Sequence, residues 1–253
     1  KSMYSYEYIK SVLTQPNSIL AVEYKKAINA FAPNMKLKLI KRIGAGYSDN
    51  SMSSVLPSAT AVREAIFAGR SFDGVLPSIC SELLNKEIEV GNAPISLQSL
   101  EQAILYRIRT IAEDDLLNLY DCAPGMSGLI RAAAYEASGI YEAIRKCVNK
   151  SYTASRIRRL FLAALLEQTN QLMEKCSHAD IPLHVLAARD NGVLAALSSY
   201  SRRPIITRTN QFPEDNDIFS FNVKAQNIYS LTQAPENRRA MHDYTHKLKL
   251  YRP

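Results

Sequence analysis

The spacing of hydrophobic and polar residues changes near Pro77, and the change predicts two kinds of structure within one chain. Before this point, helical patterns precede an alternating segment over residues 36–43, which is typical of a strand. A loop rich in Gly and Ser then leads to a helical pattern over residues 60–69. This order of elements favours an α/β unit over residues 1–76.

After Pro77 the apolar residues recur mostly at helical spacing, which predicts a mainly helical domain over residues 77–253. Near the end of this region, short strand patterns at 181–188 and 204–207 flank a helical pattern at 191–200 and predict a small αβ appendage. The other helices expected along the chain cover residues 5–13, 19–31, 78–87, 96–110, 113–120, 126–137, 140–148, 154–168 and 217–231.

Composition adds a class of partner to this picture. Of 253 residues, 47% are hydrophobic and 22% charged, which is typical of a globular protein and not of a disordered one. The formal charge of +7 and the pI near 9.2 favour an anionic partner such as nucleic acid or a nucleotide. No apolar run approaches the length of a membrane span, so we expect no membrane partner.

The cysteines predict the cellular compartment. They form no C-x-x-C pair, which argues against a zinc ribbon and against a redox motif. Four reduced, buried thiols are typical of a cytoplasmic protein, and the N-terminus does not resemble a secretory signal. These residues are Cys80, Cys122, Cys147 and Cys176.

A cationic, glycine-punctuated loop follows the predicted strand, with the sequence K-R-I-G-A-G-Y over residues 41–47. Gly44 and Gly46 allow the backbone to approach a ligand closely, and Arg42 can bind a phosphate with two N–H groups. The next helix begins near Ser58 and Thr60, where free backbone N–H groups attract anions. Together these features predict half of a nucleotide site.

Asn17 lies at a turn that opens a helix, and Arg42 lies at the end of the predicted strand. Strand ends and the neighbouring helices of an α/β sheet converge on one crevice, so both side chains can meet a nucleotide there. The alternative is that Asn17 is only a helix cap and Arg42 a solvated charge. Likewise, Ser58 or Thr60 caps any helix equally well.

A second cationic region extends from Arg145 to Arg159 and contains no acidic residue. Its tyrosine, Tyr152, is placed to stack on a base. Ile157, Leu160, Phe161 and Ala164 form the stripe that we expect to be buried, which leaves a basic face for nucleic acid. The alternative is an ordinary solvated face. The cations of this region are Arg145, Lys146, Lys150, Arg156, Arg158 and Arg159.

Few residues suggest metal binding. His242 and His246 have the i, i+4 spacing of a helical metal site, but the sequence offers no third ligand, so a surface pair is expected. The adjacent acids Asp114 and Asp115 are typical of a helix first turn. We therefore expect no metal site and assign no catalytic residue.

Three segments, in this order, resemble the bacterial tRNA(Met) cytidine acetate ligase family: residues 16–27, 41–47 and 58–63. Residues 149–160 resemble the basic helix of the same family. The resemblance implies that residues 1–76 are the remnant of a Rossmann-like nucleotidyltransferase domain, followed by a helical tRNA-binding domain.

The resemblance also implies a chemistry. Family members activate acetate with ATP to acetyl-adenylate, release pyrophosphate, and transfer the acetyl group to N4 of the wobble cytidine of elongator tRNA(Met). The partners implied are therefore tRNA, acetate and ATP, with Mg²⁺ expected beside the triphosphate. The implied ATP contacts are Asn17, Arg42, Gly44, Gly46, Ser58, Thr60 and Arg63. The residues expected to contact tRNA are Lys150, Tyr152, Arg156, Arg158 and Arg159.

The chain departs from the family in two places. It lacks the H-x-G-H signature of the family's N-terminal half, so we expect this chain to be inactive without that half. Residues 125–129 also differ from the G-L-E-N-R-like stretch of the family, which leaves the tRNA contacts open. Two alternatives remain: a nucleotidyltransferase that adenylates another small acid without RNA, and a non-catalytic nucleic-acid-binding module.

Overall fold

The computed structural model describes residues 5–40, 52, 56–212, 216–245 and 247–251. By its internal contacts the chain divides into two compact units, residues 1–69 and 70–253. The division falls at residue 69, whereas the domain boundary predicted from the sequence follows residue 76, and that boundary stays a prediction.

The described part of the first unit is helical. Helix α1 (Tyr6–Leu13) is capped by Ser5, and α2 (Pro16–Phe31) begins with a proline, which suits the first position of a helix. Helix α3 (Ala59–Phe67) confirms the helix predicted near Thr60.

The strand predicted over residues 36–43 is wrong for residues 36–40, which form no strand. An alternating segment becomes a strand only where another strand pairs with its backbone, and the described residues of this unit provide none. The remaining residues of that prediction, 41–43, lie outside the described residues.

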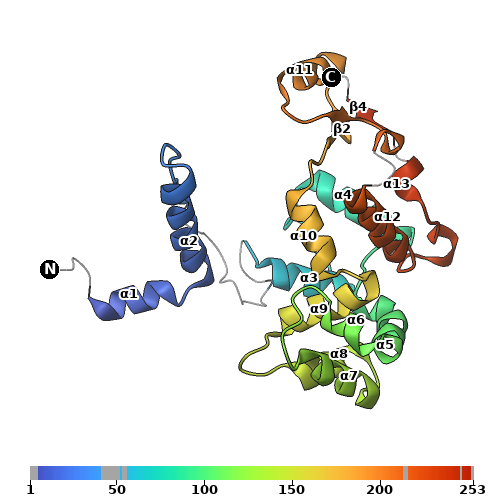
Figure 1. Cartoon of the computed structure of the whole chain (residues 1–253). Coiled ribbons are helices and arrows are strands. Elements are labelled where there is room, and N and C mark those ends of the chain that lie inside the picture. The colour runs from blue at the N-terminus through green and yellow to red at the C-terminus, as the bar shows by residue number, and fades with distance from the viewer. Residues whose placement is uncertain (1–4, 41–51, 53–55, 213–215, 246, 252–253) are drawn as a thin grey trace. The chain divides into compact units, whose positions relative to one another are not determined.

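The core of the second unit is a group of packed helices, drawn in green to yellow in Figure 1. Helix α5 (Glu101–Thr110) contacts both α7 (Met126–Glu136) and α9 (Ala154–Leu166), and α8 (Ile140–Cys147) packs on α7 and α9. Short α6 (Glu113–Leu117) packs on α7. The stripe predicted in α9 is confirmed, because the side chains of Ile157, Leu160, Phe161 and Ala164 are all buried.

Helix boundaries differ from the sequence predictions where the backbone changes conformation. The predicted helix 96–110 is divided into a 3₁₀ turn, η1 (Leu97–Leu100), and α5. The predicted helix 154–168 ends at Leu166 because Glu167 adopts a left-handed conformation with φ of 57°. Helix α4 (Ser78–Glu89) precedes this group.

The C-terminal part contains the predicted αβ appendage. Strand β1 (Leu183–His184) pairs in parallel with β3 (Ile205–Ile206), and α11 (Asn191–Tyr200) lies between them in sequence. The predicted strand 181–188 is in fact two short strands, because β2 (Ala187–Ala188) pairs in parallel with β4 (Lys249–Leu250). Helix α11 contacts β2, which Figure 1 shows next to β4.

The remaining elements of this part are helical. They are α10 (Asn170–His178), η2 (Thr209–Gln211), α12 (Asp217–Ser230), η3 (Pro235–Asn237) and α13 (His242–Thr245). The segment before η3 packs on the turn after α4, where Gly91 has φ of +74°. A Cβ at Gly91 would lie 2.7 Å from the Cβ of Ala234, so only glycine fits there.

Candidate nucleic-acid interface

The basic residues of α9 lie at the end of the helix where positive charge is least favourable. Arg156, Arg158 and Arg159 occupy its first two turns, and the first turn contains no acidic residue. The N-terminus of a helix carries the positive end of its dipole, which disfavours nearby cations. The helix dipole therefore does not favour these arginines, which makes this end of α9 a candidate site for an anionic partner.

Arg156 is held by an acidic residue from the segment between α6 and α7. Its Nη2 lies 2.8 Å from Oδ1 of Asp121 and donates to the carbonyl oxygen of Asp121 at 3.1 Å. Its guanidinium carbon lies 5.5 Å from the centre of the Tyr152 ring, in a cation–π contact. Arg156 was expected on an exposed basic face, but its side chain is only 29% exposed.

Tyr152 is half-buried and packs against the helical core. Because Arg156 covers its ring, the structure gives Tyr152 an intramolecular partner at the position where a base was expected. This arrangement depends on a tertiary contact that the sequence pattern of α9 does not predict, because Asp121 reaches α9 from the segment between α6 and α7.

Three other cations of this face point to solvent. Arg159 lies 3.6 Å from the second carboxylate oxygen of Asp121, yet 66% of its side chain is exposed. Lys150 and Arg158 are exposed and form no ion pair or hydrogen bond with any residue that the structure describes. The loop before the helix is fixed by Asn149, whose Oδ1 accepts from the backbone N–H groups of Ser151 and Tyr152 at 2.8 and 3.0 Å.

Beside this face, a cleft of about 580 Å³ lies between α8 and α9. Two exposed arginines, one from each helix, line it, and neither is paired with an acid among the described residues. Both arginines belong to the basic interval of the sequence, whereas Tyr141 precedes that interval and was not predicted to belong to the interface. The missed signal is the i, i+4, i+7 spacing of Tyr141, Arg145 and Val148 on one helix face. The lining residues are Tyr141, Ile144, Arg145, Val148, Ala154 and Arg158.

The acids of α7 and α8 near this cleft are already engaged. Glu142 accepts from the Ser138 hydroxyl at 2.6 Å and from the Ser138 N–H at 3.0 Å, and these hydrogen bonds lower the pKa of its carboxyl group. Glu136 pairs with Lys146 at 3.0 Å. Lys146 neutralises Glu136, whereas Glu142 remains a carboxylate, so the two arginines still leave the cleft with a net positive charge.

Part of the expected nucleotide site lies at the start of α3. Ser58 is buried and caps this helix, accepting from the N–H of Ala61 at 3.1 Å. Arg63 is exposed and donates to the hydroxyl of Thr60 at 3.4 Å, so these three residues are brought together.

The other expected nucleotide contacts are placed differently. Asn17 is exposed in the first turn of α2 and does not cap that helix, because the N-cap residue is Gln15. Arg42, Gly44 and Gly46 lie outside the described residues.

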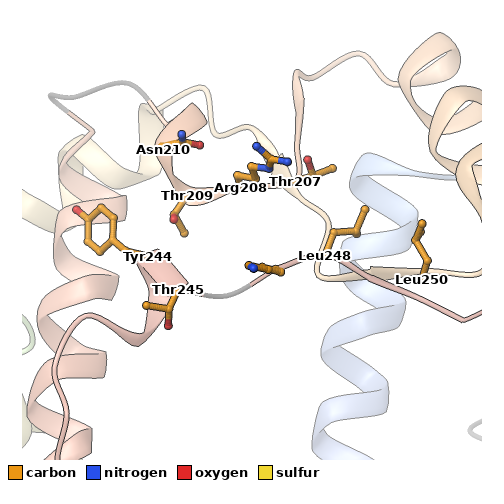
Figure 2. Close-up of a pocket in the computed structure, with 9 residues that line it drawn as sticks. Thr207, Arg208, Thr209, Asn210, Tyr244, Thr245, Leu248 and Leu250 are labelled. Carbon is orange, nitrogen blue, oxygen red and sulfur yellow. The ribbon is translucent and has the colours of Figure 1, made fainter.

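The C-terminal part contains two further cavities, which the sequence does not predict. Figure 2 shows the larger one, of about 840 Å³, where Arg208 and Thr209 lie near Tyr244 and Thr245 of α13. A more apolar cavity of about 620 Å³ shares Thr209 with it. The wall of this second cavity contains two stacked aromatic rings, those of Phe212 and Phe219, with centres 4.3 Å apart.

The described residues contain neither a metal centre nor a membrane-spanning helix. No group of three or more His, Cys, Asp or Glu side chains within them is arranged to hold a metal ion. Of the predicted histidine pair, His242 begins α13 and His246 lies outside the described residues. Within the same residues, no helix combines the length and the hydropathy needed to span a membrane.

The fold and this interface define a mainly helical protein with a cationic face at the start of α9. A family model described as HIGH Nucleotidyl Transferase matches residues 1–243. The chain therefore belongs to this nucleotidyltransferase family.

Relatives narrow the comparison. The chain is 35% identical over 162 residues to the tRNA(Met) cytidine acetate ligase of Thermosipho africanus, covering 64% of this chain and 38% of the relative. It is 26% identical over 248 residues to the protein of that name from a Thermoanaerobacter species, covering 95% and 61%. The chain thus spans less than two thirds of the length of these relatives.

Two solved structures share the fold. The apo crystal structure of Thermotoga maritima TmcAL superposes with a TM-score of 0.79 at 26% identity, covering 94% of this chain and 61% of that one. A second crystal structure of Thermotoga maritima TmcAL, bound with alpha-thio ATP, superposes with a TM-score of 0.75 at 23% identity.

Proposed function

We propose that this chain is part of an ATP-dependent tRNA ligase that activates acetate as acetyl-adenylate and acetylates N4 of the wobble cytidine of elongator tRNA(Met). The observation that carries the proposal is the similarity to proteins named tRNA(Met) cytidine acetate ligase, which covers 95% of this chain in one relative. The shared fold at a TM-score of 0.79 supports it.

The proposed ATP contacts follow from the chemistry of adenylation. An acetate oxygen forms a bond to the α-phosphorus of ATP as the bond to pyrophosphate breaks, and negative charge develops on the phosphate oxygens. Backbone N–H groups at a helix N-terminus and nearby cations stabilise such charge. In this chain α3 supplies the N–H groups, with Ser58 and Thr60 at its start and Arg63 beside them.

Asn17, Arg42, Gly44 and Gly46 are the other ATP contacts that we propose, on the strength of the family resemblance. We expect Mg²⁺ to accompany the triphosphate. Support for ATP as the nucleotide comes from the homologous fold that was crystallised with alpha-thio ATP.

For tRNA, we propose that Lys150, Arg158 and Arg159 contact phosphates directly, because their side chains are exposed at the start of α9. Arg156 and Tyr152 belong to the same interface, but their mutual contact and the contact of Arg156 with Asp121 give them a positioning role. They hold the segment between α6 and α7 against α9, which shapes the surface that meets the RNA.

The RNA contacts are tested by measuring tRNA binding over a salt series. We expect the triple variant Lys150→Ala/Arg158→Ala/Arg159→Ala to bind more weakly than the unchanged chain. Each lost phosphate contact should reduce the slope of log K against log salt by about 0.7 to 0.9. A matched control removes three exposed cations elsewhere, Arg70, Lys86 and Arg202. Equal slopes for the unchanged chain and both variants would show that the face is merely solvated.

The ATP half of the proposal has a separate test. The 253 residues contain no H-x-G-H sequence, so we expect no acetate-dependent ATP–pyrophosphate exchange from this chain alone. Exchange by the isolated chain would contradict that expectation. ATP binding without tRNA binding would favour a nucleotidyltransferase for another small acid, and tRNA binding without ATP binding a non-catalytic module.

A further inference from the structure

The cleft between α8 and α9 combines an apolar floor with a cationic rim. Ile144 is buried and Ala154 is half-buried, whereas 43% of Tyr141 and 42% of Val148 are exposed. Its volume of about 580 Å³ lies within the range of small-molecule sites, about 300 to 1,000 Å³. An exposed aromatic ring beside an exposed valine is apolar surface that a flat partner can cover.

The two arginines at this cleft come from different helices and are free to bind a ligand. Arg145 lies in the last turn of α8 and Arg158 in the second turn of α9. Neither forms an ion pair within the described ranges. Asp121 pairs with Arg156, and Glu142 accepts from Ser138, although Arg145 is near enough to help lower the pKa of the Glu142 carboxyl group. A guanidinium group binds phosphate with two parallel N–H groups, so this pair suits two successive phosphates.

Tyr141 differs from Tyr152 in what covers its ring. Tyr152 packs against the core and lies beneath the Arg156 guanidinium, so binding a base there would require displacing Arg156. Tyr141 lines an open cleft and is 43% exposed. Of the two aromatic residues next to the basic face, Tyr141 is therefore the one that is ready to stack.

We propose that this cleft binds one unstacked base of a single-stranded RNA segment. The base stacks on the ring of Tyr141, and Arg145 and Arg158 bind the phosphates on either side of it. Bases inside a duplex have both faces covered by their neighbours, so this site selects a loop or a single strand over a helix. The inference rests on the proposed RNA-binding function and adds the kind of RNA structure that is recognised.

The test compares a single-stranded RNA of about ten nucleotides with a blunt-ended RNA duplex, using the whole 253-residue chain. We expect Tyr141→Ala to weaken binding of the single strand about five- to one-hundred-fold and to leave duplex binding unchanged. Tyr141→Phe keeps an aromatic face and should bind within about two-fold of the unchanged chain. Since no charge is removed, the salt slope should be the same in all three proteins.

The arginines are tested in the same assay. Arg145→Ala/Arg158→Ala should weaken binding of the single strand and lower its salt slope by about 1.4, whereas the control Lys86→Ala/Arg202→Ala should not. Because Tyr141 is partly exposed, we expect its variants to fold as the unchanged chain does, and urea unfolding verifies this.

The outcomes separate this inference from the proposed function. If Tyr141→Ala binds the single strand as the unchanged chain does, while Lys150→Ala/Arg158→Ala/Arg159→Ala loses binding, RNA binding stands and the base-stacking site is wrong. If the unchanged chain binds neither tRNA nor the single strand in a salt-dependent manner, the proposed function fails and this inference fails with it.

Discussion

Arg156 and Asp121 contact each other twice, although they are 35 residues apart in the chain. The Arg156 Nη2 lies 2.8 Å from the Asp121 carboxylate and 3.1 Å from the Asp121 carbonyl oxygen. Asp121 adopts a left-handed backbone conformation with φ of 65°, which is unfavourable for a residue with a Cβ. The arginine therefore stabilises a strained position at the segment between α6 and α7.

Because Arg156 is paired and Arg158 is not, their variants should differ in stability. We expect Arg156→Ala to lower the free energy of unfolding by about 1 to 2 kcal/mol, because charged hydrogen bonds are lost in a partly buried place. Arg158→Ala, in the same helix, removes an exposed cation and should change that free energy by less than about 0.5 kcal/mol. Urea unfolding of both variants checks this, and equal losses would contradict it.

The start of α8 depends on a carboxylate from α5. Glu101 Oε2 accepts from the N–H of Ile140 at 2.7 Å, and a Cβ added at Gly139 would lie 2.7 Å from that same oxygen. We expect Glu101→Ala and Gly139→Ala each to cost about 1 kcal/mol of unfolding free energy. In the double variant the added methyl meets no carboxylate. Since Gly139 has an extended φ of −160°, alanine there should become neutral or stabilising.

A double-mutant cycle in urea measures that coupling. Additive losses from the two substitutions would show that the Gly139 methyl and the Glu101 carboxylate do not compete for the same space.

Burial of Cys147 makes stability depend on alkaline pH. Burial raises the pKa of its thiol from 9.0 to about 11. As the pH rises, the thiol of the unfolded chain loses its proton before the buried thiol does. The contribution of Cys147 to the free energy of unfolding is therefore fully present below pH 9 and is lost as the pH rises towards 11. Between pH 8 and 10 we expect a loss of about 1 kcal/mol from this group. The free energy of unfolding of Cys147→Ala should fall less over the same pH interval, because the variant and the unchanged chain have all their other titrating groups in common.

Thiol accessibility gives an independent measurement. The expectation that all four thiols are buried is wrong at Cys80, which is exposed. We expect Cys80 to react rapidly with an alkylating reagent at pH 8 and Cys147 to react only after unfolding. Rapid reaction of Cys147 in the folded protein would contradict its burial.

Acidic pH should weaken the end of α9. Glu167 binds Lys224 and lies 3.0 Å from Arg107. The hydrogen bond from Lys224 is the main cause that lowers the pKa of its carboxyl group below 4.5. The stabilisation is therefore present above pH 4.5 and is lost as the pH falls below that value.

Because Glu167 is half exposed, Glu167→Gln should cost less than about 1 kcal/mol at pH 7 and a smaller amount at pH 3. Glu174→Gln, at an exposed glutamate with no ion pair in the described part of the chain, is the control. Urea unfolding at both pH values decides the matter, and an equal effect of the two substitutions would contradict the prediction.

The helices around the core were predictable because their apolar residues repeat strongly. Ile157 and Phe161 of α9 are examples: spacing alone identifies them as buried, and both are fully buried. Helix α10 was missed because its nine residues contain only two large apolar side chains, Leu172 and Met173, which produce no clear period. Strand β4 was missed because two residues cannot show an alternating pattern.

The cations of the candidate interface could be predicted from the sequence, but the ion pairs that they form could not. Arg145 and Arg158 stand out in a sequence interval without acids, but the interval does not contain Asp121. Asp121 reaches Arg156 only through tertiary folding, so no local pattern distinguishes Arg156 from Arg158. Tyr141 lies before the basic interval, so it could be found only by extending the helical face of Arg145 towards the N-terminus of α8.

The two ends of helix α9 differ in charge and in what they contact. Its first turns present cations to solvent, while Glu167 at its other end binds side chains of both α5 and α12. Its 13 residues span about 20 Å at 1.5 Å per residue. The helix is thus a spacer of fixed length: a polyanion at its basic end is kept about two nanometres from α12, and only the gain or loss of a helical turn would alter that distance.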